Sequence, residues 1–223
     1  MKKYILLILV VVAAAVANPA AAQTGGSLWL TWHTNTYAPP GFTGKALPTA
    51  DSEIAASVEA ISGGKVLDIS KEMIRWYVDS TITEYGVGKK NINLRAPGVA
   101  GTKIILTVEL PGRDDLLPKT AEVPVVRPEA VVDAPYPSGF FSGEKIVLQV
   151  HPFFFNVASL ADLSSSWKIN DSVPEGSANP DRVEINMAPG TADGFPVNVV
   201  VSLRNPLNTL ESATKKTTLF YRR

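Results

Sequence analysis

The sequence repeats itself at an interval of 91 to 93 residues, and this internal repeat constrains the fold more than any other feature. Three elements recur in the same order, each as a first and a second copy: Trp76 and Trp167, Arg95–Pro97 and Met187–Pro189, and the Val/Leu-rich segments 107–110 and 200–203. Repeats that build solenoids are about 20–50 residues long, so a repeat of this length is a whole domain. The sequence therefore predicts a tandem of two similar small domains.

The N-terminus has the composition of a signal segment. Two lysines near the start precede an unbroken apolar run, Ile5–Ala17, which is followed by an Asn-Pro pair and the small residues Ala20–Ala22. The run of 13 residues is shorter than the roughly 20 that a membrane-spanning helix needs. We therefore expect residues 1–22 to be a cleaved signal peptide and the mature protein to begin at Gln23. An uncleaved N-terminal anchor is the alternative, and we expect contact with a membrane only in that case.

Charge and cysteine content narrow the function classes. The formal net charge is zero, and the chain contains no run of Lys or Arg. Nucleic-acid binding and a polybasic membrane patch both need a positive surface, so neither is expected. Cysteine is absent, although an exported protein could form disulfides, so each domain depends on the burial of its own core. We expect an exported protein that is periplasmic, extracellular or on the cell surface.

The region after the signal segment indicates short strands between turns. Stretches rich in Val, Ile and Leu alternate with Gly, Pro and Asn, and 17 prolines and 16 glycines leave room only for a short helical turn at 156–165. The expected strands are Leu28–Trp32, Ile54–Ile61, Ile74–Val78, Ile92–Leu94, Lys103–Leu110, Lys145–Val150, Trp167–Ile169, Val183–Met187, Val197–Leu203 and Thr217–Tyr221. Repeated short strands at this spacing are typical of β-sandwiches. The predicted fold is all-β, with two tandem immunoglobulin-like β-sandwich domains at 23–127 and 128–223.

Apolar alternation and the repeated tryptophans predict where the cores lie. In Lys103–Leu110 every second residue from Ile104 onward is apolar, as in a strand with one buried face. Trp76 and Trp167 each stand at the head of a repeat, and we expect both to be core residues that fill the space between two sheets. The proline-flanked segment 126–135 is expected to form a semi-rigid connection between the domains.

The repeat unit resembles a known class of domain. Its Trp-x-Val-Asp (Trp76–Asp79) or Trp-x-Ile-Asn (Trp167–Asn170), its Ala-Pro-Gly and its long Val-rich strand resemble bacterial immunoglobulin-like and PKD-like domains of exported proteins. With Trp32–Pro48 and Ser202–Tyr221, nearly the whole mature chain is similar to two-module exported proteins of candidate-phyla bacteria. The resemblance implies the fold and export, and it supplies no catalytic residues.

The residue inventory offers little chemistry for catalysis. His33 and His151 are the only histidines, and neither has a flanking nucleophile motif, whereas a catalytic triad needs a histidine between a serine and a carboxylate. No esterase, zinc-protease or Walker motif occurs. Gly86–Lys89 is nearest to a phosphate-binding loop, but it lacks the strand-to-helix context and is expected to be a plain β-turn. We expect a protein that is not an enzyme and needs no cofactor.

Acidic residues give only a weak signal for a glycosidase or a metal site. Asp114 and Asp115 are adjacent in an expected hairpin turn, where acids normally face water and do not flank a sugar. Exported β-domains bind calcium through acidic loops, and the candidates here are Asp114, Asp115, Glu129, Asp133 and Asp171. No EF-hand loop occurs, so no metal site is predicted.

Aromatic residues are the remaining functional signal. The candidate binding or inter-domain aromatics are Trp29, Tyr37, Phe42, Tyr136, Phe140, Phe141 and Phe154. Successive strand residues point to opposite faces, so Phe153–Phe155 cannot all enter one core. We expect these rings to lie in a core or between the domains. If the domains dock end to end, the hypothesis is that Tyr37 and Phe42 meet Tyr136 or Phe140. The alternative is an exposed aromatic patch that binds a glycan or a protein.

These expectations together predict a non-enzymatic exported protein, structural or adhesive, that acts through protein–protein contacts at the cell envelope or surface. The partner is expected in the same envelope or on another cell, because free edge strands of sandwiches pair with strands of other chains. The alternative is a pair of carbohydrate-binding modules that serves a separate enzyme. Exposed coplanar rings favour the glycan, and an exposed apolar edge or patch without them favours a protein partner.

Overall fold

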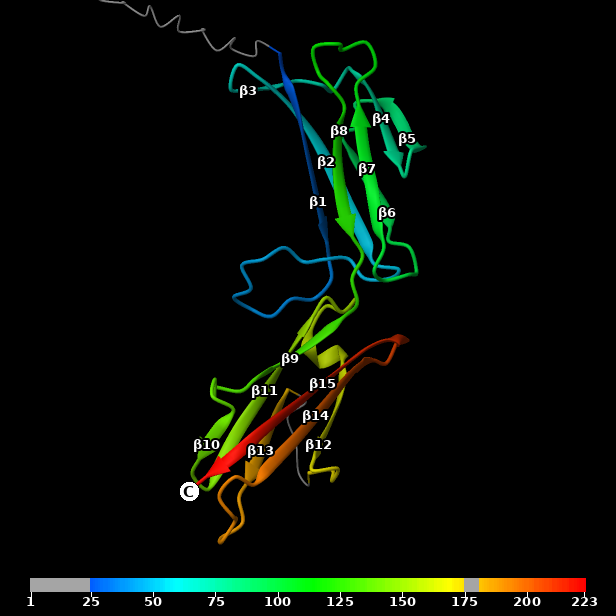
Figure 1. Cartoon of the computed structure of the whole chain (residues 1–223). Coiled ribbons are helices and arrows are strands. Elements are labelled where there is room, and N and C mark those ends of the chain that lie inside the picture. The colour runs from blue at the N-terminus through cyan, green and yellow to red at the C-terminus, as the bar shows by residue number, and fades with distance from the viewer. Residues whose placement is uncertain (1–24, 175–180) are drawn as a thin grey trace, which may run out of the picture.

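The computed structural model describes residues 25–174 and 181–223, and its regular structure is almost entirely β-strand (Figure 1). Two β-sandwich domains follow one another end to end, each with its own buried core. The predicted all-β class, with tandem immunoglobulin-like sandwiches, is confirmed. The predicted signal peptide, residues 1–22, lies outside the described residues. Among the residues that are described, no helix has both the length and the apolar character needed to cross a membrane.

Domain 1 consists of two antiparallel sheets. The first is built around β2 and contains β1 (Ser27–Thr34), β2 (Glu53–Ser62), β3 (Lys65–Leu67) and β6 (Asn91–Arg95). The second contains β4 (Met73–Val78), β5 (Thr81–Val87), β7 (Lys103–Glu109) and β8 (Lys119–Pro124). In the first sheet β2 pairs with β1, β3 and β6, and the second sheet has the order β5-β4-β7-β8. This order leaves β5 as an end strand.

Domain 2 also consists of two sheets, one of three strands and one of four. Its first sheet has the order β13-β11-β9 and contains β9 (Glu129–Asp133), β11 (Lys145–Phe153) and β13 (Arg182–Asn186). Its second sheet has the order β10-β15-β14-β12 and contains β10 (Phe140–Ser142), β12 (Ser164–Ile169), β14 (Pro196–Asn205) and β15 (Asn208–Arg222). The helical turn η1 (Leu160–Asp162) lies within the segment where a short helical turn was expected.

The sequence repeat corresponds to equivalent strands in the two sandwiches. Trp76 lies in β4 and Trp167 in β12, and each of these strands pairs with the long strand that follows in its repeat, β7 or β14. Both tryptophans are buried, and they belong to the separate cores of domains 1 and 2. The Trp76 indole N–H donates a hydrogen bond of 2.7 Å to the Lys89 carbonyl, so its polar atom has a partner inside the sandwich.

The connection between the domains is shorter than expected. The segment 126–135 contains β9, which pairs with β11 along its length, so most of that segment belongs to domain 2. The prolines flank this strand and do not interrupt it, and Ala130 within it is buried. The true connection lies between β8 and β9, where the Val126 N–H donates to the Pro48 carbonyl at 2.9 Å. The connection is therefore tied to the loop between β1 and β2.

Candidate functional site: the domain junction

The loop between β1 and β2 spans residues 35–52, and its part 35–48, which reaches from domain 1 to domain 2, is called the junction loop (Figure 1). The Tyr37 N–H donates to the Phe155 carbonyl at 2.7 Å, and the Phe154 N–H donates to the Tyr37 carbonyl at 2.7 Å. Phe154 has a φ of 64°, in the left-handed region that side chains with a Cβ rarely adopt. The two backbone hydrogen bonds fix the register of the junction loop on domain 2.

An aromatic cluster packs around these backbone hydrogen bonds. The Phe42 ring meets Phe153 at 5.3 Å and Phe154 at 6.2 Å between centroids, both edge to face, an arrangement that rings prefer. Phe155 points away from the cluster and is fully buried in the core of domain 2. The three successive phenylalanines therefore divide between one core and the junction, because the left-handed turn at Phe154 breaks the strand alternation.

The remaining aromatics of domain 2 do not reach the junction, so the expected contacts of Tyr37 and Phe42 with Tyr136 or Phe140 are wrong. β10 pairs in parallel with the C-terminal part of β15, which carries Phe140 and Phe141 to the far end of the domain. There Phe140 packs on Phe220 at 5.7 Å, while Phe141 is buried in the core beside Tyr136 at 5.9 Å. These rings stabilise the closing strand of domain 2.

Trp29 is the most exposed of the predicted binding aromatics. Its side chain is 58% exposed on β1, whereas Trp32, three residues on, is partly buried against the core. The Lys45 ammonium of the junction loop lies 3.3 Å from the centroid of the Trp32 ring, a cation–π contact. Partial burial at this position lowers the pKa of Lys45 below its ordinary value. Trp32 thus anchors the junction loop to domain 1.

A buried carboxylate joins the two domains. Glu211, near the start of β15, is only 5% exposed. It accepts hydrogen bonds from the Asn156 N–H, from the Asn205 side-chain amide at 2.7 Å, and from the Thr49 hydroxyl of domain 1 at 3.5 Å. Within the described ranges no Lys, Arg or His forms an ion pair with it. A carboxylate held this way depends on its hydrogen-bond donors, so it restricts how the domains are placed.

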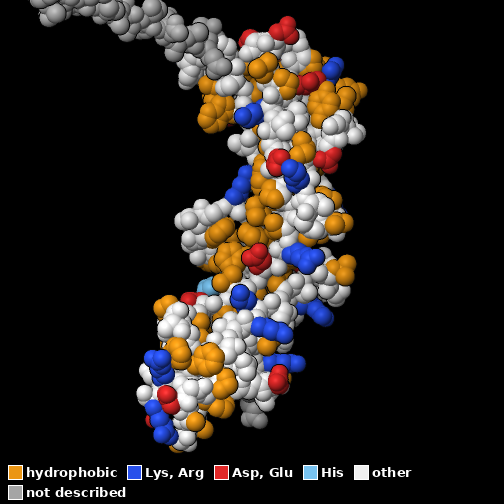
Figure 2. Space-filling view, viewed as in Figure 1, with side chains coloured by type: hydrophobic (Ala, Val, Ile, Leu, Met, Phe, Trp, Pro, Cys, Tyr) orange, Lys and Arg blue, Asp and Glu red, His pale blue; other side chains and the backbone are white. Residues whose placement is uncertain are grey.

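A pocket of about 210 Å³ opens beside this carboxylate, between the domains. Both domains and the connection line it, with Thr49, Gly98, Ala100, Val126, Arg127, Leu210 and Glu211 among its residues. Leu210 of β15 lines the pocket and is 93% exposed. Leu207 of the β14–β15 turn, 95% exposed, and the exposed Val99 of domain 1 are each next in sequence to a lining residue. Hydrophobic side chains are visible at this level of the molecule in Figure 2. We call Val99, Leu207 and Leu210 with this pocket the junction surface.

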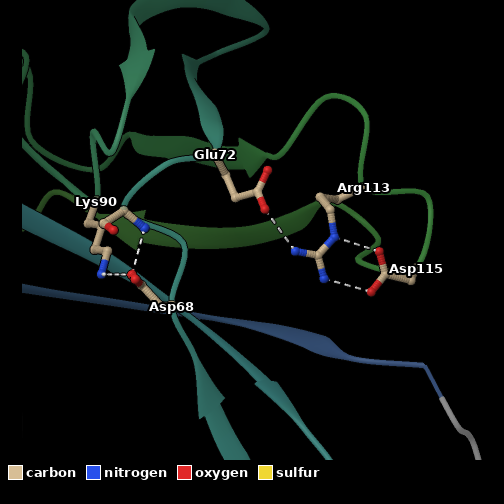
Figure 3. Close-up of polar contacts among 6 residues, drawn as sticks. Asp68, Glu72, Lys90, Arg113 and Asp115 are labelled. Carbon is tan, nitrogen blue, oxygen red and sulfur yellow. Dashed lines mark hydrogen bonds and ion pairs between the residues drawn. The ribbon is translucent and has the colours of Figure 1, made fainter.

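One of the two adjacent acids of the β7–β8 loop, Asp115, has a structural role. Arg113 donates two hydrogen bonds of 2.8 Å to Asp115 and one of 3.1 Å to Glu72 (Figure 3). These bonds lower the pKa of Asp115 and raise that of Arg113. Asp68 forms a separate, longer ion pair with Lys90, at 3.8 Å. The network ties the loop to the segment before β4, at the end of domain 1 that is remote from domain 2.

The two histidines belong to different domains. His33 is exposed on β1 and His151 lies on β11 of the other domain. In the part of the chain that is described, no three His, Asp or Glu side chains are close enough to hold a metal ion. Gly86–Lys89 is not a plain β-turn, because Gly86 and Val87 end β5 and only Gly88, with a φ of 68°, makes the turn.

Comparison with known proteins finds similarity in solved structures alone. No protein-family model and no curated protein matches the sequence. Three N-terminal domains of the Highly Immunogenic Outer Capsid protein (Hoc) of bacteriophage RB49 align with a TM-score of 0.45 and 12% identity, over 88% of this chain and 59% of that chain. Fibronectin(III)-like modules of CbhA from Clostridium thermocellum align with a TM-score of 0.30 and 13% identity, over 87% and 94%.

The C-terminal 282-residue fragment of intimin, solved in complex with the intimin-binding domain of the translocated intimin receptor, is also similar. It aligns with a TM-score of 0.30 and 12% identity, over 78% of this chain and 61% of that chain. This chain thus spans less than two thirds of the Hoc and intimin structures. Likenesses at this level carry no functional conclusion. The chain is a tandem of two immunoglobulin-like β-sandwich domains on the basis of its own strand pairing and its two cores.

Proposed function

We propose that this chain is an exported, non-enzymatic binding protein, structural or adhesive, that contacts a protein partner at the cell envelope or surface. The observation that carries the proposal is the junction surface, where Leu210 lines a pocket between the domains and Leu207 follows closely in the same hairpin, both almost fully exposed. Exposed apolar groups gathered around a pocket are a common mark of a protein-binding site. A contact there spans both domains, so it depends on their relative placement.

The connection between the domains supports this role. The junction loop is held by two backbone hydrogen bonds and by the Phe42 cluster, and the Glu211 carboxylate adds a further link between the domains. A surface composed of two domains keeps its shape only when the domains do not rotate freely, and small inter-domain contacts normally allow such rotation. A preorganised surface loses less conformational entropy when it binds a partner.

The arrangement of the aromatic rings favours a protein over a glycan. The ring pairs of the described residues are tilted or edge to face, with interplanar angles from 39° to 78°. A sugar-binding platform presents its rings in one plane, whereas the most exposed apolar groups here are aliphatic leucines. The apolar surface without coplanar rings is the feature that we expected of a protein-binding module.

Site-specific photocrosslinking in the native cells tests the proposal. A photoreactive amino acid at position 207 or 210 is expected to give one discrete crosslinked product with an envelope or surface protein. Leu117 and Val173, which are also highly exposed but lie elsewhere, are the matched control positions and are expected to give none. Equal products at the control positions, or no product at the junction, would contradict the proposed role of this surface.

Cell fractionation with N-terminal sequencing tests the proposed export. A mature start at Gln23 in the exported fraction supports a released or surface-held protein. An intact Met1 in the membrane fraction instead makes the tandem a membrane-tethered protein.

A carbohydrate-binding pair remains the second candidate, and Trp29 is the observation that favours it. Its exposed indole stands on the outer face of β1, on the same sheet as a polar depression lined by His33, Asn35, Glu53 and Asn93. Aromatic and amide side chains on a sheet face suit a sugar. Glycan-array binding that is lost in Trp29→Ala and retained in Leu207→Ser would favour this function over the first.

A further inference from the structure

The outer edge of domain 1 carries a second apolar surface, which the proposed function does not use. β5 ends its sheet, so the backbone N–H and C=O groups on its outer side have no partner strand within the described residues. On this strand Ile82, Tyr85 and Val87 are exposed at 50%, 65% and 62%. Hydrophobic side chains are visible along this margin of domain 1 in Figure 2. A free edge with exposed apolar side chains is a template for another strand.

The other end strands have features that discourage such pairing. β8 begins with Lys119 and ends in Pro124, and both residue types block strand addition. β3 and β10 contain three residues each, and β6 and β13 are short strands with an arginine at one end. β12 carries Lys168, β9 begins and ends with an acid, and β1 lies beside β8 of the facing sheet. β5 has seven residues with neither proline nor lysine among them. Its register on β4 shifts at Thr83, so the regular part of this edge, and the part most open to pairing, is Glu84–Val87.

The charges of β5 indicate what kind of strand fits it. Glu84 is its one charged residue, and the Lys89 ammonium of the same chain lies 3.5 Å from the Glu84 carboxylate. A partner strand therefore needs no compensating charge. It needs uncharged side chains that favour β-structure, with apolar groups on the outer face. β5 of a second copy has this composition.

Self-pairing centred on Tyr85 suits both copies, because Tyr85 lies in the regular part of β5. With antiparallel strands centred on Tyr85, the two Tyr85 rings oppose each other, Thr83 opposes Val87, and Glu84 opposes Gly86. Aromatic and β-branched pairs stabilise a sheet, and like charges placed opposite each other destabilise it. A register centred on Glu84 overlaps over more residues, but it places two carboxylates opposite each other. The Tyr85 register is therefore favoured.

We propose that β5 pairs antiparallel with β5 of a second copy of this chain, about a twofold axis at Tyr85. The pairing joins two four-stranded sheets into one continuous sheet and uses the same surface on both copies, as twofold symmetry requires. The contact lies on β5 and not on the β14–β15 turn, so it is independent of the junction surface. Both surfaces are available in the dimer for separate partners.

Single-cysteine variants test the register, because the natural chain contains no cysteine. Opposite residues of antiparallel strands have Cα atoms about 4.5–5.5 Å apart, within the range that a disulfide spans. Tyr85→Cys is therefore expected to form a disulfide dimer on mild oxidation. Thr83→Cys and Val87→Cys are expected to remain monomers when alone and to form a mixed disulfide together. Trp29→Cys, at an exposed aromatic on another strand, is the matched control and is expected to stay reduced.

Sedimentation equilibrium of the purified protein tests the association itself. The natural chain is expected to dimerise. Tyr85→Lys places two cations opposite each other at the axis and is expected to raise the dissociation constant of the dimer by at least about tenfold. An equimolar mixture of Tyr85→Lys and Tyr85→Glu is expected to restore the dimer. Tyr85 is exposed, so an unchanged melting temperature checks that the variants fold.

Two results overturn the proposal. One is a natural chain that stays monomeric over the whole concentration range, which is also the outcome if β5 receives a strand from a different protein. The other is a Tyr85→Cys variant that oxidises no faster than Trp29→Cys.

Discussion

Replacing Glu211 with alanine is expected to destabilise domain 2 and loosen its contact with domain 1. The carboxylate accepts hydrogen bonds from the Asn156 N–H and from the Asn205 amide in a place that is almost closed to water. Truncation takes this acceptor from both donors, at about 1–3 kcal/mol each. The same change removes a buried charge whose desolvation opposes folding. We therefore expect a net loss of about 2–3 kcal/mol in the free energy of unfolding of domain 2.

The Glu211→Gln variant separates the charge from the shape. Glutamine keeps the side-chain volume and one oxygen acceptor, but its amide N–H₂ faces a hydrogen-bond donor. The free energy of unfolding is therefore expected to fall by about 1 kcal/mol. Glu59→Ala removes an exposed carboxylate from β2 and is expected to change stability by less than about 0.5 kcal/mol. Hydrogen exchange at increasing urea concentrations gives a separate free energy of unfolding for each domain, because a two-domain chain does not unfold as one unit. Small-angle scattering reports whether the domains move apart.

Two outcomes would refute this reasoning. A loss below about 0.5 kcal/mol for Glu211→Ala, with unchanged scattering, would mean that other acceptors satisfy the two donors. Equal losses for Gln and Ala would mean that the negative charge, and not the number of acceptors, holds the junction.

Three further predictions concern the core, the junction loop and the acid range. Trp76→Ala empties the centre of domain 1 and is expected to cost about 3–5 kcal/mol in urea unfolding, leaving hydrogen exchange in domain 2 unchanged. Tyr37→Pro removes the N–H that bonds the Phe155 carbonyl, so small-angle scattering is expected to show a wider spread of domain orientations, without loss of either core. Arg113 lowers the pKa of Asp115. The pair therefore contributes its full stabilisation above the ordinary Asp pKa of about 4, and this contribution is lost as the pH falls through the lowered pKa of Asp115. Asp115→Asn is therefore expected to flatten the acid side of the melting-temperature profile, and an unchanged profile would contradict it.

Most of the fold could be read from the sequence because the relevant signals are local. Every second residue of Lys103–Leu110 from Ile104 onward is apolar, and these positions form the buried face of β7 and its extension at Leu110. All ten expected strands overlap strands of the structure. The repeat predicted two sandwiches because equivalent strands recur at equivalent positions.

The sequence does not identify β5, for a physical reason. An end strand with one neighbour does not need apolar residues on its inner face, and the large apolar side chains of β5 are exposed. Its glycine-containing end also favours a turn over a strand. The sequence predicts a connection at β9 because proline occurs in linkers and also beside strands, as it does here. In both cases the neighbouring strand decides the structure, and the sequence pattern does not identify that neighbour.

The candidate site could be predicted only in part. The position of Tyr37 and Phe42 in a loop that meets domain 2 follows from their aromatic character, which favours burial. Their partners depend on the left-handed turn at Phe154 and on the parallel pairing of β10 with β15. Neither feature has a strong sequence signal. The exposed Leu207 and Leu210 lie in a stretch that looks like ordinary hairpin sequence.

The fold class, the repeat and the two buried tryptophans could be predicted from local sequence, because a strand with one buried face shows an apolar period of two in its own residues. The contacts at the junction could not be predicted in this way. Glu211 is one of 21 acidic residues in the chain, and nothing near it in sequence distinguishes it. It becomes a link between domains only because the fold brings Thr49, 162 positions earlier, against its carboxylate. Long-range contacts of this kind arise from how strands and loops are stacked in space, so no local pattern encodes them.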